Sequence, residues 1–276
     1  MNRNLTLALI SGLCLFGLTP TVKAEDTLAK IQRTGVLTVA IREDAAPFGY
    51  TDSGKLRGYC LDFFALLESQ LIETLERDTL SLKLLKSTPS NRFSLVANNI
   101  IDLECGPNTI RDDAPEGTNF STDFFVTGTQ FLVRRENKLN PNSNLDGAQL
   151  GVIANTTTSE YIRERYPNAT IVSYRGVTAR NRGIQAVVQG KIDAMISDGI
   201  LLRSEAQQQQ LPSAEYPLVP NIPLTCDRYG MIIQADDPEW QDLVNSVIES
   251  PETETLTRAW FGNLFNYILP AKDFCQ

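Results

Sequence analysis

The feature that most constrains the fold is an alternation of strand-like and helix-like segments that occurs twice along the chain. The first series runs through residues 26–106, and the second runs through residues 150–209. In both, short β-branched or apolar runs alternate with segments whose apolar residues recur at helical spacing. Strands that alternate with helices in this way predict parallel sheets with helices packed on their faces. The sequence therefore predicts an α/β protein with two units of similar size.

Two longer extended segments separate and follow these series. Residues 124–137 lie between the series, and residues 223–236 follow the second one and precede two helical segments. If both extended segments cross between two lobes, the first lobe is discontinuous. We therefore expect a first lobe made of residues 25–128 and 226–276, and a second lobe made of residues 129–225. A ligand would then bind in the cleft between the lobes, at the carboxyl ends of the strands.

An arginine stands where the first strand-like segment ends. Arg42 follows the apolar run from Gly35 to Ile41, and arginine side chains are seldom buried unless they are paired. We hypothesise that the partner of Arg42 is a ligand. The alternative is a surface arginine that pairs with Glu43 or Asp44. Polar residues also follow three other strand-like segments: Asn108 and Thr109, residues 155–158, and Asp198.

The first 24 residues have the features of a secretory signal peptide. They contain Arg3, an apolar run from Leu5 to Leu18, and a small-residue cleavage site that ends at Ala24. We therefore expect cleavage near Ala24 and a soluble, periplasmic mature chain. The net charge is −8, and no block of basic residues stands out, which argues against nucleic acid or an anionic membrane surface as a partner.

Histidine and cysteine usage limits the chemistry of the chain. There is no histidine, which excludes Ser-His-Asp and Cys-His nucleophiles and the usual zinc sites. We expect no metal and no cofactor, although catalysis by carboxylates or lysine stays open. Cys14 lies in the predicted signal peptide, and the other cysteines favour disulfides in an exported chain, with three pairings open. A redox-active thiol is less favoured because no CxxC motif occurs. These four cysteines are Cys60, Cys105, Cys226 and Cys275.

Several short motifs occur along the chain in one order. They are GVLTVAIREDAAPFGY, GYCLDFF, STPSNRFSL, DLECG, FFVTGTQFL, TTSE, GKIDAMISD and AWF. Together they resemble the type-2 solute-binding proteins for amino acids, most closely the periplasmic glutamate/aspartate-binding proteins, over essentially the whole mature chain. The resemblance implies a two-lobed fold that closes like a hinge around an amino acid, with glutamate or aspartate as the first candidate. It also implies an ABC permease and ATPase as partners, and we expect a monomer.

The same resemblance implies a set of ligand-binding residues. Arg42 and Arg92 match the arginines that hold the two carboxylates of a dicarboxylic amino acid, and a guanidinium can bind a carboxylate through two charge-assisted hydrogen bonds. Asp198 matches the acid that binds the α-ammonium group, and Phe48 matches an aromatic residue at the cleft wall. A helix N-terminus favours anions as well. The threonines that match hydroxyl-bearing ligand-binding positions of the family are Thr109, Thr156, Thr157 and Thr158.

The chain departs from the family pattern at several positions. Pro89 and Pro107 replace residues that carry polar groups in the family. Arg111 lies three residues before Ala114, where the wider family often has a carboxylate-binding arginine, and Arg180 falls about where the family has a histidine. Each candidate also has a structural alternative. Asp198 would be a helix N-cap, the threonines a helix start and Phe48 a core residue, while Arg111 would pair with Asp112 and Asp113.

The resemblance also bears on the disulfides and on rival functions. Ionotropic glutamate receptors have a bridge in a place similar to Cys226–Cys275, which would leave Cys60 to pair with Cys105. A polar neutral or basic amino acid is the alternative ligand, if Arg42 faces solvent and Glu43 or Asp44 lines the cleft. A few proteins that resemble this family are dehydratases, but the sequence offers no matched catalytic acid and base, so we expect no enzyme activity.

Overall fold

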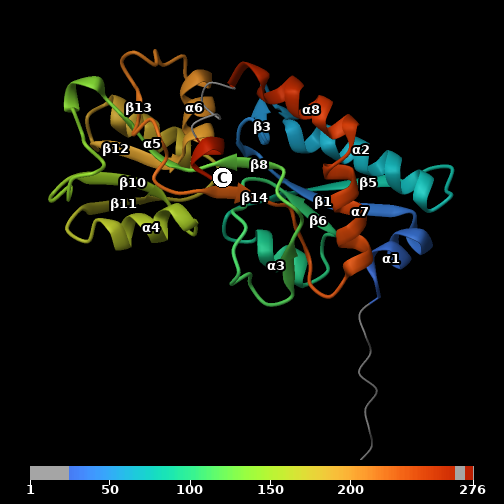
Figure 1. Cartoon of the computed structure of the whole chain (residues 1–276). Helices are drawn as coiled ribbons and strands as arrows, with labels where there is room; N and C mark the ends of the chain where they lie inside the picture. The colour runs from blue at the N-terminus through green and yellow to red at the C-terminus, as the bar shows by residue number, and fades with distance from the viewer. Residues whose placement is uncertain (1–24, 265–270, 276) are drawn as a thin grey trace, which may run out of the picture.

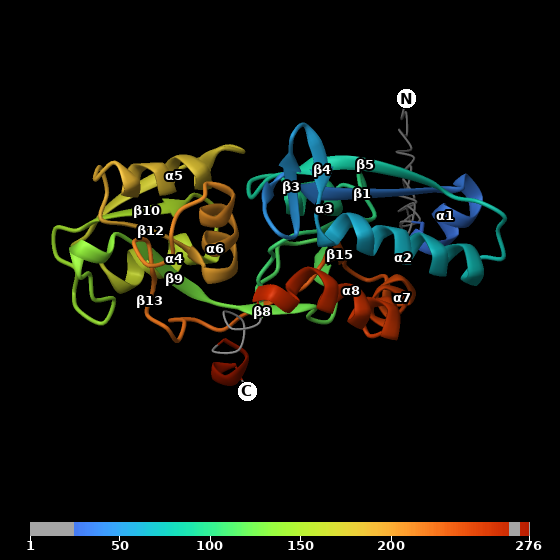
Figure 2. The ribbon, with the colours of Figure 1, turned by 90° about the horizontal axis from the view of Figure 1, so that it is seen from above.

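The computed structural model describes residues 25–264 and 271–275. The chain forms two lobes, each built on a mixed β-sheet with helices against it (Figures 1 and 2). The predicted α/β class and two-lobed architecture are therefore confirmed. The predicted signal peptide, residues 1–24, lies outside the described residues, so its cleavage stays a prediction.

The sheet of the first lobe has the strand order β5-β1-β6-β15-β7. The strands β1, β5 and β6 run parallel, whereas β15 enters from the far end of the chain and pairs antiparallel with β6 and β7. Helices α7 and α8 follow β15, so the C-terminal helices return to the first lobe. The elements of this lobe's main sheet and its helices are α1 (Thr27–Thr34), β1 (Val36–Arg42), α2 (Tyr59–Thr74), β5 (Ser81–Ser87), α3 (Arg92–Ala97), β6 (Leu103–Cys105), β7 (Thr118–Phe120), β15 (Ile232–Gln234), α7 (Pro238–Ile248) and α8 (Pro251–Phe261).

The sheet of the second lobe has the strand order β11-β10-β12-β9-β13. Here β10, β11 and β12 run parallel, and β9 lies antiparallel to both β12 and β13. The second lobe thus repeats the arrangement of the first, as the two series in the sequence predict. Its elements are β9 (Thr129–Val133), β10 (Gln149–Ile153), α4 (Thr157–Arg165), β11 (Thr170–Tyr174), α5 (Ala179–Val188), β12 (Ala194–Asp198), α6 (Gly199–Gln208) and β13 (Leu218–Val219).

Two short antiparallel strands join the lobes. They are β8 (Phe125–Thr127) and β14 (Asp227–Tyr229), and Figure 1 shows both between the lobes. The two connecting segments come so close that a Cβ atom on Gly128 would lie 1.9 Å from the carbonyl oxygen of Thr225. Only glycine fits there, because real Cβ atoms are not found at such a distance. We propose that the lobe boundaries fall at this crossing, at residues 128/129 and 225/226.

Short strands account for most of the differences from the predicted elements. Each predicted extended segment, 124–137 and 223–236, is broken into two strands instead of continuing as one. A small sheet follows β1 and was not predicted, because strands of two to four residues carry no measurable periodicity. It consists of β2 (Asp44–Ala45), β3 (Gly49–Asp52) and β4 (Lys55–Arg57).

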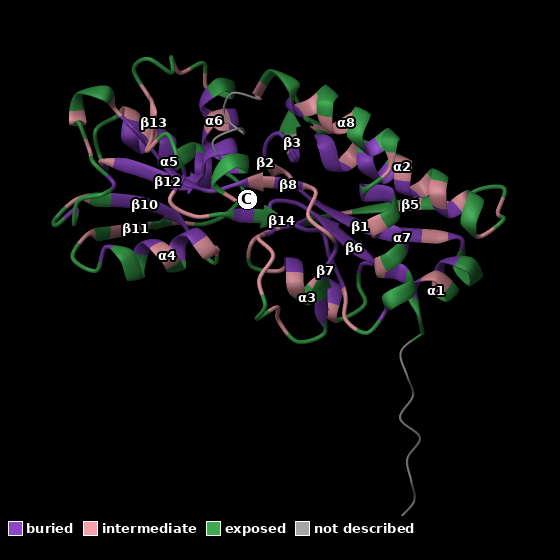
Figure 3. Cartoon of the chain, viewed as in Figure 1, coloured by how far each residue is buried: buried purple, intermediate pink, exposed green. Residues whose placement is uncertain are grey.

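The central strands are buried on both faces. Six of the seven residues of β1 are buried, as expected for a parallel strand that helices cover on either side. Figure 3 shows buried strands in the middle of each lobe and exposed residues on the outer faces of the helices. Within the described residues, no helix is long and apolar enough to cross a membrane.

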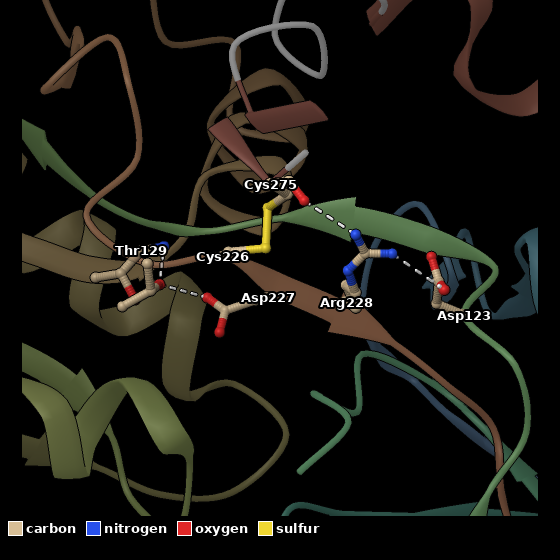
Figure 4. The surroundings of a disulfide bond; sticks show 7 residues. Asp123, Thr129, Cys226, Asp227, Arg228 and Cys275 are labelled. Carbon is tan, nitrogen blue, oxygen red and sulfur yellow. Dashed lines mark hydrogen bonds and ion pairs between the residues drawn. A yellow bond between two sulfur atoms is a disulfide. The ribbon is translucent and has the colours of Figure 1, made fainter. Parts of the chain in front are cut away.

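Both disulfides implied by the family resemblance are present. Cys60 in α2 is bonded to Cys105 at the end of β6, and Cys226 is bonded to Cys275. The second bridge ties the C-terminal segment to the start of β14, beside Asp227 (Figure 4). Arg228 reinforces this attachment, because its guanidinium donates a hydrogen bond to the carbonyl oxygen of Cys275 at 2.9 Å.

Removal of the first bridge should destabilise the protein. The variant Cys60→Ser/Cys105→Ser opens a link between residues 45 positions apart, and we expect it to lower the free energy of unfolding by about 2–4 kcal/mol. Urea unfolding of the oxidised variant beside the unchanged protein measures this loss. An unchanged free energy of unfolding would contradict the expectation.

Candidate functional site

A cleft between the lobes brings together most of the predicted site residues. The space between the lining side chains is about 380 Å³, part of it open to solvent. Its walls carry three arginines and one aspartate as well as hydroxyl groups. The lining residues are Arg42, Arg92, Pro107, Thr109, Ile153, Thr156, Thr157, Thr158, Arg180, Ser197, Asp198 and Leu201.

Arg92 is a buried cation without a full set of partners. It is the first residue of α3, it is only 7% exposed, and its Nε has no hydrogen-bond acceptor among the described residues. Burial lowers the pKa of Arg92 to about 10, and the like charge of Arg42 acts in the same direction while Glu104 opposes it. Burial of an incompletely paired charge is costly. Such a group at a cleft wall is therefore suited to receive an anion.

Glu104 lies near this arginine and was not predicted as a site residue. It is fully buried in β6, and its carboxylate accepts hydrogen bonds from Ser87 Oγ and Asn108 Nδ2, both at 2.6 Å. The polar residues at the ends of neighbouring strands thus serve partly to hold this carboxylate. The only sequence signal was an acidic residue inside a short apolar strand.

Arg42 lies at the cleft as predicted, but its main partner belongs to the protein. Its Nε and Nη2 donate hydrogen bonds to the two carboxylate oxygens of Asp44 at 2.8 and 2.9 Å. The hypothesis that the partner of Arg42 is a ligand is therefore wrong. The alternative is right about the partner Asp44 and wrong about the surface location, because the arginine side chain is 2% exposed and that of Asp44 is 7% exposed. The pair forms because the β2–β3 hairpin turns Asp44 back toward the end of β1.

Arg180 reaches across the cleft from the second lobe. It lies in α5, is buried, and donates a hydrogen bond from Nη1 to the main-chain carbonyl oxygen of Asp44. Its Nε has no acceptor within the described part of the chain. Burial lowers the pKa of Arg180, while the charge of Asp44 opposes this shift. A second buried guanidinium thus contributes unused hydrogen-bonding capacity to the cleft.

Asp198 provides the negative pole of the cleft. It ends β12 and is the N-cap residue of α6, as the structural alternative states, but its side chain makes no capping hydrogen bond. Instead its carboxylate accepts hydrogen bonds from Thr158 Oγ1 at 3.0 Å and from the hydroxyl of Tyr229. Burial raises the pKa of Asp198, and these two hydrogen bonds oppose the rise. Tyr229, which comes from the connector β14, was not predicted as a site residue.

The threonines combine structural and site roles. Thr156 is the N-cap of α4, with its Oγ1 accepting from the main-chain N–H of Ser159 at 3.2 Å, which is the helix-start alternative. The hydroxyls of Thr157 and Thr109 lie 3.4 Å apart on opposite lobes. Because the first N–H groups of a helix lack acceptors within the helix, the start of α4 presents hydrogen-bond donors at this end of the cleft.

Two predicted ligand residues lie elsewhere. Phe48 is fully buried and packs edge-on against Phe124, Phe125 and Tyr229, so the prediction that it lies at the cleft wall is corrected to its core alternative. Arg111 lines an adjoining depression, which shares Arg92 and three threonines with the cleft, but it does not line the cleft itself. Its Nε lies 3.4 Å from Asp113, as the structural alternative held, and its Nη1 lies 3.9 Å from Glu160.

The described residues contain no group of three or more acidic or cysteine side chains placed to hold a metal ion. The cleft instead presents buried cations, one buried carboxylate and hydroxyl groups contributed by both lobes. This arrangement is chemically suited to a zwitterion, because a carboxylate can bind at the arginines and an ammonium group can bind at Asp198.

Comparison with known proteins points to one family. Residues 37–263 match the model of the bacterial extracellular solute-binding proteins, family 3. The chain is 28% identical over 253 residues to the glutamate/aspartate import solute-binding protein of Escherichia coli (strain K12), which covers 91% of this chain and 83% of that protein. It is 26% identical over 248 residues to the L-glutamate/L-aspartate-binding protein of Pseudomonas aeruginosa, with 85% and 80% covered.

Solved structures agree on the fold. The ancestral amino acid-binding protein AncCDT-1, a precursor of cyclohexadienyl dehydratase, has a TM-score of 0.72 at 22% identity, and the match covers 86% of this chain and 100% of that one. The substrate-binding protein AbpA of Streptococcus pneumoniae, bound to L-arginine, also has a TM-score of 0.72, at 18% identity, with 87% and 98% covered. At these identities the likeness concerns the fold alone.

Proposed function

Because the chain belongs to the bacterial extracellular solute-binding proteins of family 3, we propose that it captures one free amino acid between its lobes and delivers it to an ABC transporter. The observation that supports this most directly is Arg92, a buried guanidinium with an unpaired Nε in a cleft that also contains Asp198. The α-carboxylate binds at Arg92 and the start of α4. The α-ammonium group binds at Asp198, which lies on the other lobe.

The first candidate ligand is glutamate or aspartate. The two relatives described above carry that specificity in their names, and Arg180 offers a second buried guanidinium for a side-chain carboxylate. The second candidate is an uncharged polar amino acid. The Arg42–Asp44 pair favours it, because the charge of one cleft arginine is already balanced within the protein.

Closure of the lobes accompanies binding, since a ligand that contacts both lobes stabilises the state in which both sets of contacts form. We further propose that the mature chain acts as a monomer in the periplasm after cleavage near Ala24. The partners are the permease and ATPase subunits of the transporter. The proposed function includes no catalytic step.

Calorimetric titration tests this function. The oxidised protein is unfolded, washed free of carried-over ligand, refolded, and titrated with each common amino acid. We expect saturable one-to-one binding of glutamate or aspartate, or of their amides, and no turnover of a prephenate-like substrate. The absence of binding by every amino acid would contradict the proposal.

A further inference from the structure

We propose that Asp44 determines how strongly the cleft prefers a ligand with a side-chain carboxylate, because Asp44 occupies the arginine that would otherwise receive that carboxylate. The inference rests on the proposed function and deepens it. It concerns the choice between an acidic amino acid and its amide, such as glutamate and glutamine.

The first step is the geometry of the Arg42–Asp44 pair. The guanidinium and the carboxylate meet through two hydrogen bonds, Nε to Oδ1 and Nη2 to Oδ2. This is the bidentate arrangement that a ligand carboxylate would adopt with an arginine. Both side chains are almost fully buried, so the pair differs from a surface ion pair, which water weakens. One donor edge of Arg42 is therefore taken by the protein.

The second step is that the backbone of Asp44 is held on two sides. Within the first lobe, Asp44 pairs with Tyr50 in the hairpin of β2 and β3. From the second lobe, Arg180 donates a hydrogen bond to the carbonyl oxygen of Asp44. A carboxylate on a fixed backbone stays beside Arg42 when the lobes are closed. A ligand carboxylate would have to displace it or approach it closely.

The third step is the consequence for a ligand. A second carboxylate in this cleft meets an arginine whose charge is balanced, and it also meets the negative charge of Asp44 in surroundings that screen charge poorly. A side-chain amide carries no net charge and does not experience this repulsion. Asp44 therefore lowers affinity for the acid more than for the amide. Asp44 affects selectivity by pairing with Arg42.

The test compares glutamate and glutamine affinities in matched variants. Asp44→Asn keeps the shape of the side chain and one acceptor oxygen, and it releases the charge of Arg42. The double variant Arg42→Gln/Asp44→Asn removes both charges at once, so it leaves no unpaired buried charge. The control is Glu43→Gln at the neighbouring position, whose carboxylate pairs with Lys86 instead. Far-UV circular dichroism checks that each variant folds, and Asp44→Ser replaces Asp44→Asn if that variant does not.

We expect Asp44→Asn to raise the ratio of glutamate to glutamine affinity at least tenfold, while Glu43→Gln leaves it unchanged. In the double variant the ratio should return to within threefold of its starting value. An unchanged or lower ratio in Asp44→Asn would overturn the inference. A gain that persists in the double variant would also overturn it, because Asp44 would then act independently of Arg42. If the unchanged protein binds no amino acid, the proposed function itself fails.

Discussion

The variant Arg92→Met is expected to lose amino-acid binding by at least ~100-fold and to be more stable than the unchanged protein when no ligand is present. Removing one partner of a buried, hydrogen-bonded charge pair costs about 2–5 kcal/mol of binding free energy. In the absence of ligand, the same substitution is expected to stabilise the folded protein. The lowered pKa of Arg92 means that the folded protein disfavours its charge, in spite of Glu104. Because this pKa already includes the attraction of Glu104, the net effect of the charge on folding is unfavourable, and an apolar side chain of similar length should stabilise the ligand-free state by about 1–3 kcal/mol.

Calorimetry measures the loss of binding, and urea unfolding of ligand-free protein measures the stability. Arg258→Met is the matched control, since Arg258 is exposed on α8 and pairs only with Glu254 in the same helix among the described residues. The control should change neither quantity by much. If Arg92→Met binds as tightly as the control, Arg92 does not contact the ligand.

A second large effect is expected for Asp227→Asn in the connector β14. The free energy of unfolding of the unchanged protein should fall as the pH rises, and the variant should lack this fall. Burial and, to a smaller extent, the nearby charge of Asp198 raise the pKa of Asp227 to about 7, against the opposing effect of the hydrogen bond from Thr225 Oγ1. The folded protein therefore keeps this proton at pH values where the unfolded chain, with an ordinary aspartate pKa near 3.8, has released it.

The direction follows from proton linkage. Between about pH 4 and pH 7 the folded state binds more protons at Asp227 than the unfolded state does, so the free energy of unfolding falls as the pH rises. The contribution amounts to about 4 kcal/mol across that window. We expect the asparagine variant to lack this part of the slope and to exceed the unchanged protein in stability at pH 8.

Urea unfolding at pH 5, 6, 7 and 8 measures both proteins under the same conditions. Asp102 also has a raised pKa, chiefly because of burial, but it is present in both proteins and cancels in the difference. Parallel curves for the two proteins across this range would show that Asp227 titrates normally.

The fold could be predicted further than the site. Seven-residue strands such as β1 and β5, and a helix of the length of α2, carry enough apolar periodicity to be located from the sequence, and their order predicts the two lobes. Because strand ends meet at one edge of a parallel sheet, the same reasoning places Arg42, Asp198 and Thr157 at a common cleft.

The surroundings of the site residues could not all be predicted in the same way. Asp44 was named as an alternative partner of Arg42 because it lies two residues away, but the burial of the pair was not predicted, and the hairpin that begins at Asp44 has a first strand of only two residues. Phe48 is buried by aromatic residues from β8, β14 and α8, far along the chain. Tyr229 reaches Asp198 because the connectors cross between the lobes. The contacts of Phe48 and Tyr229 depend on tertiary packing instead of local pattern.

The Cys226–Cys275 bridge couples the C-terminal segment to the movement of the lobes. The bridge attaches the C-terminal segment to the same strand that carries Asp227 and Tyr229, so a rotation of one lobe against the other shifts that segment relative to at least one of them. An environment-sensitive dye on the exposed Lys272 would then change its emission when ligand binds, while the dye itself stays outside the cleft. The natural covalent attachment thus provides a position for an optical sensor without any change to the residues that select the ligand.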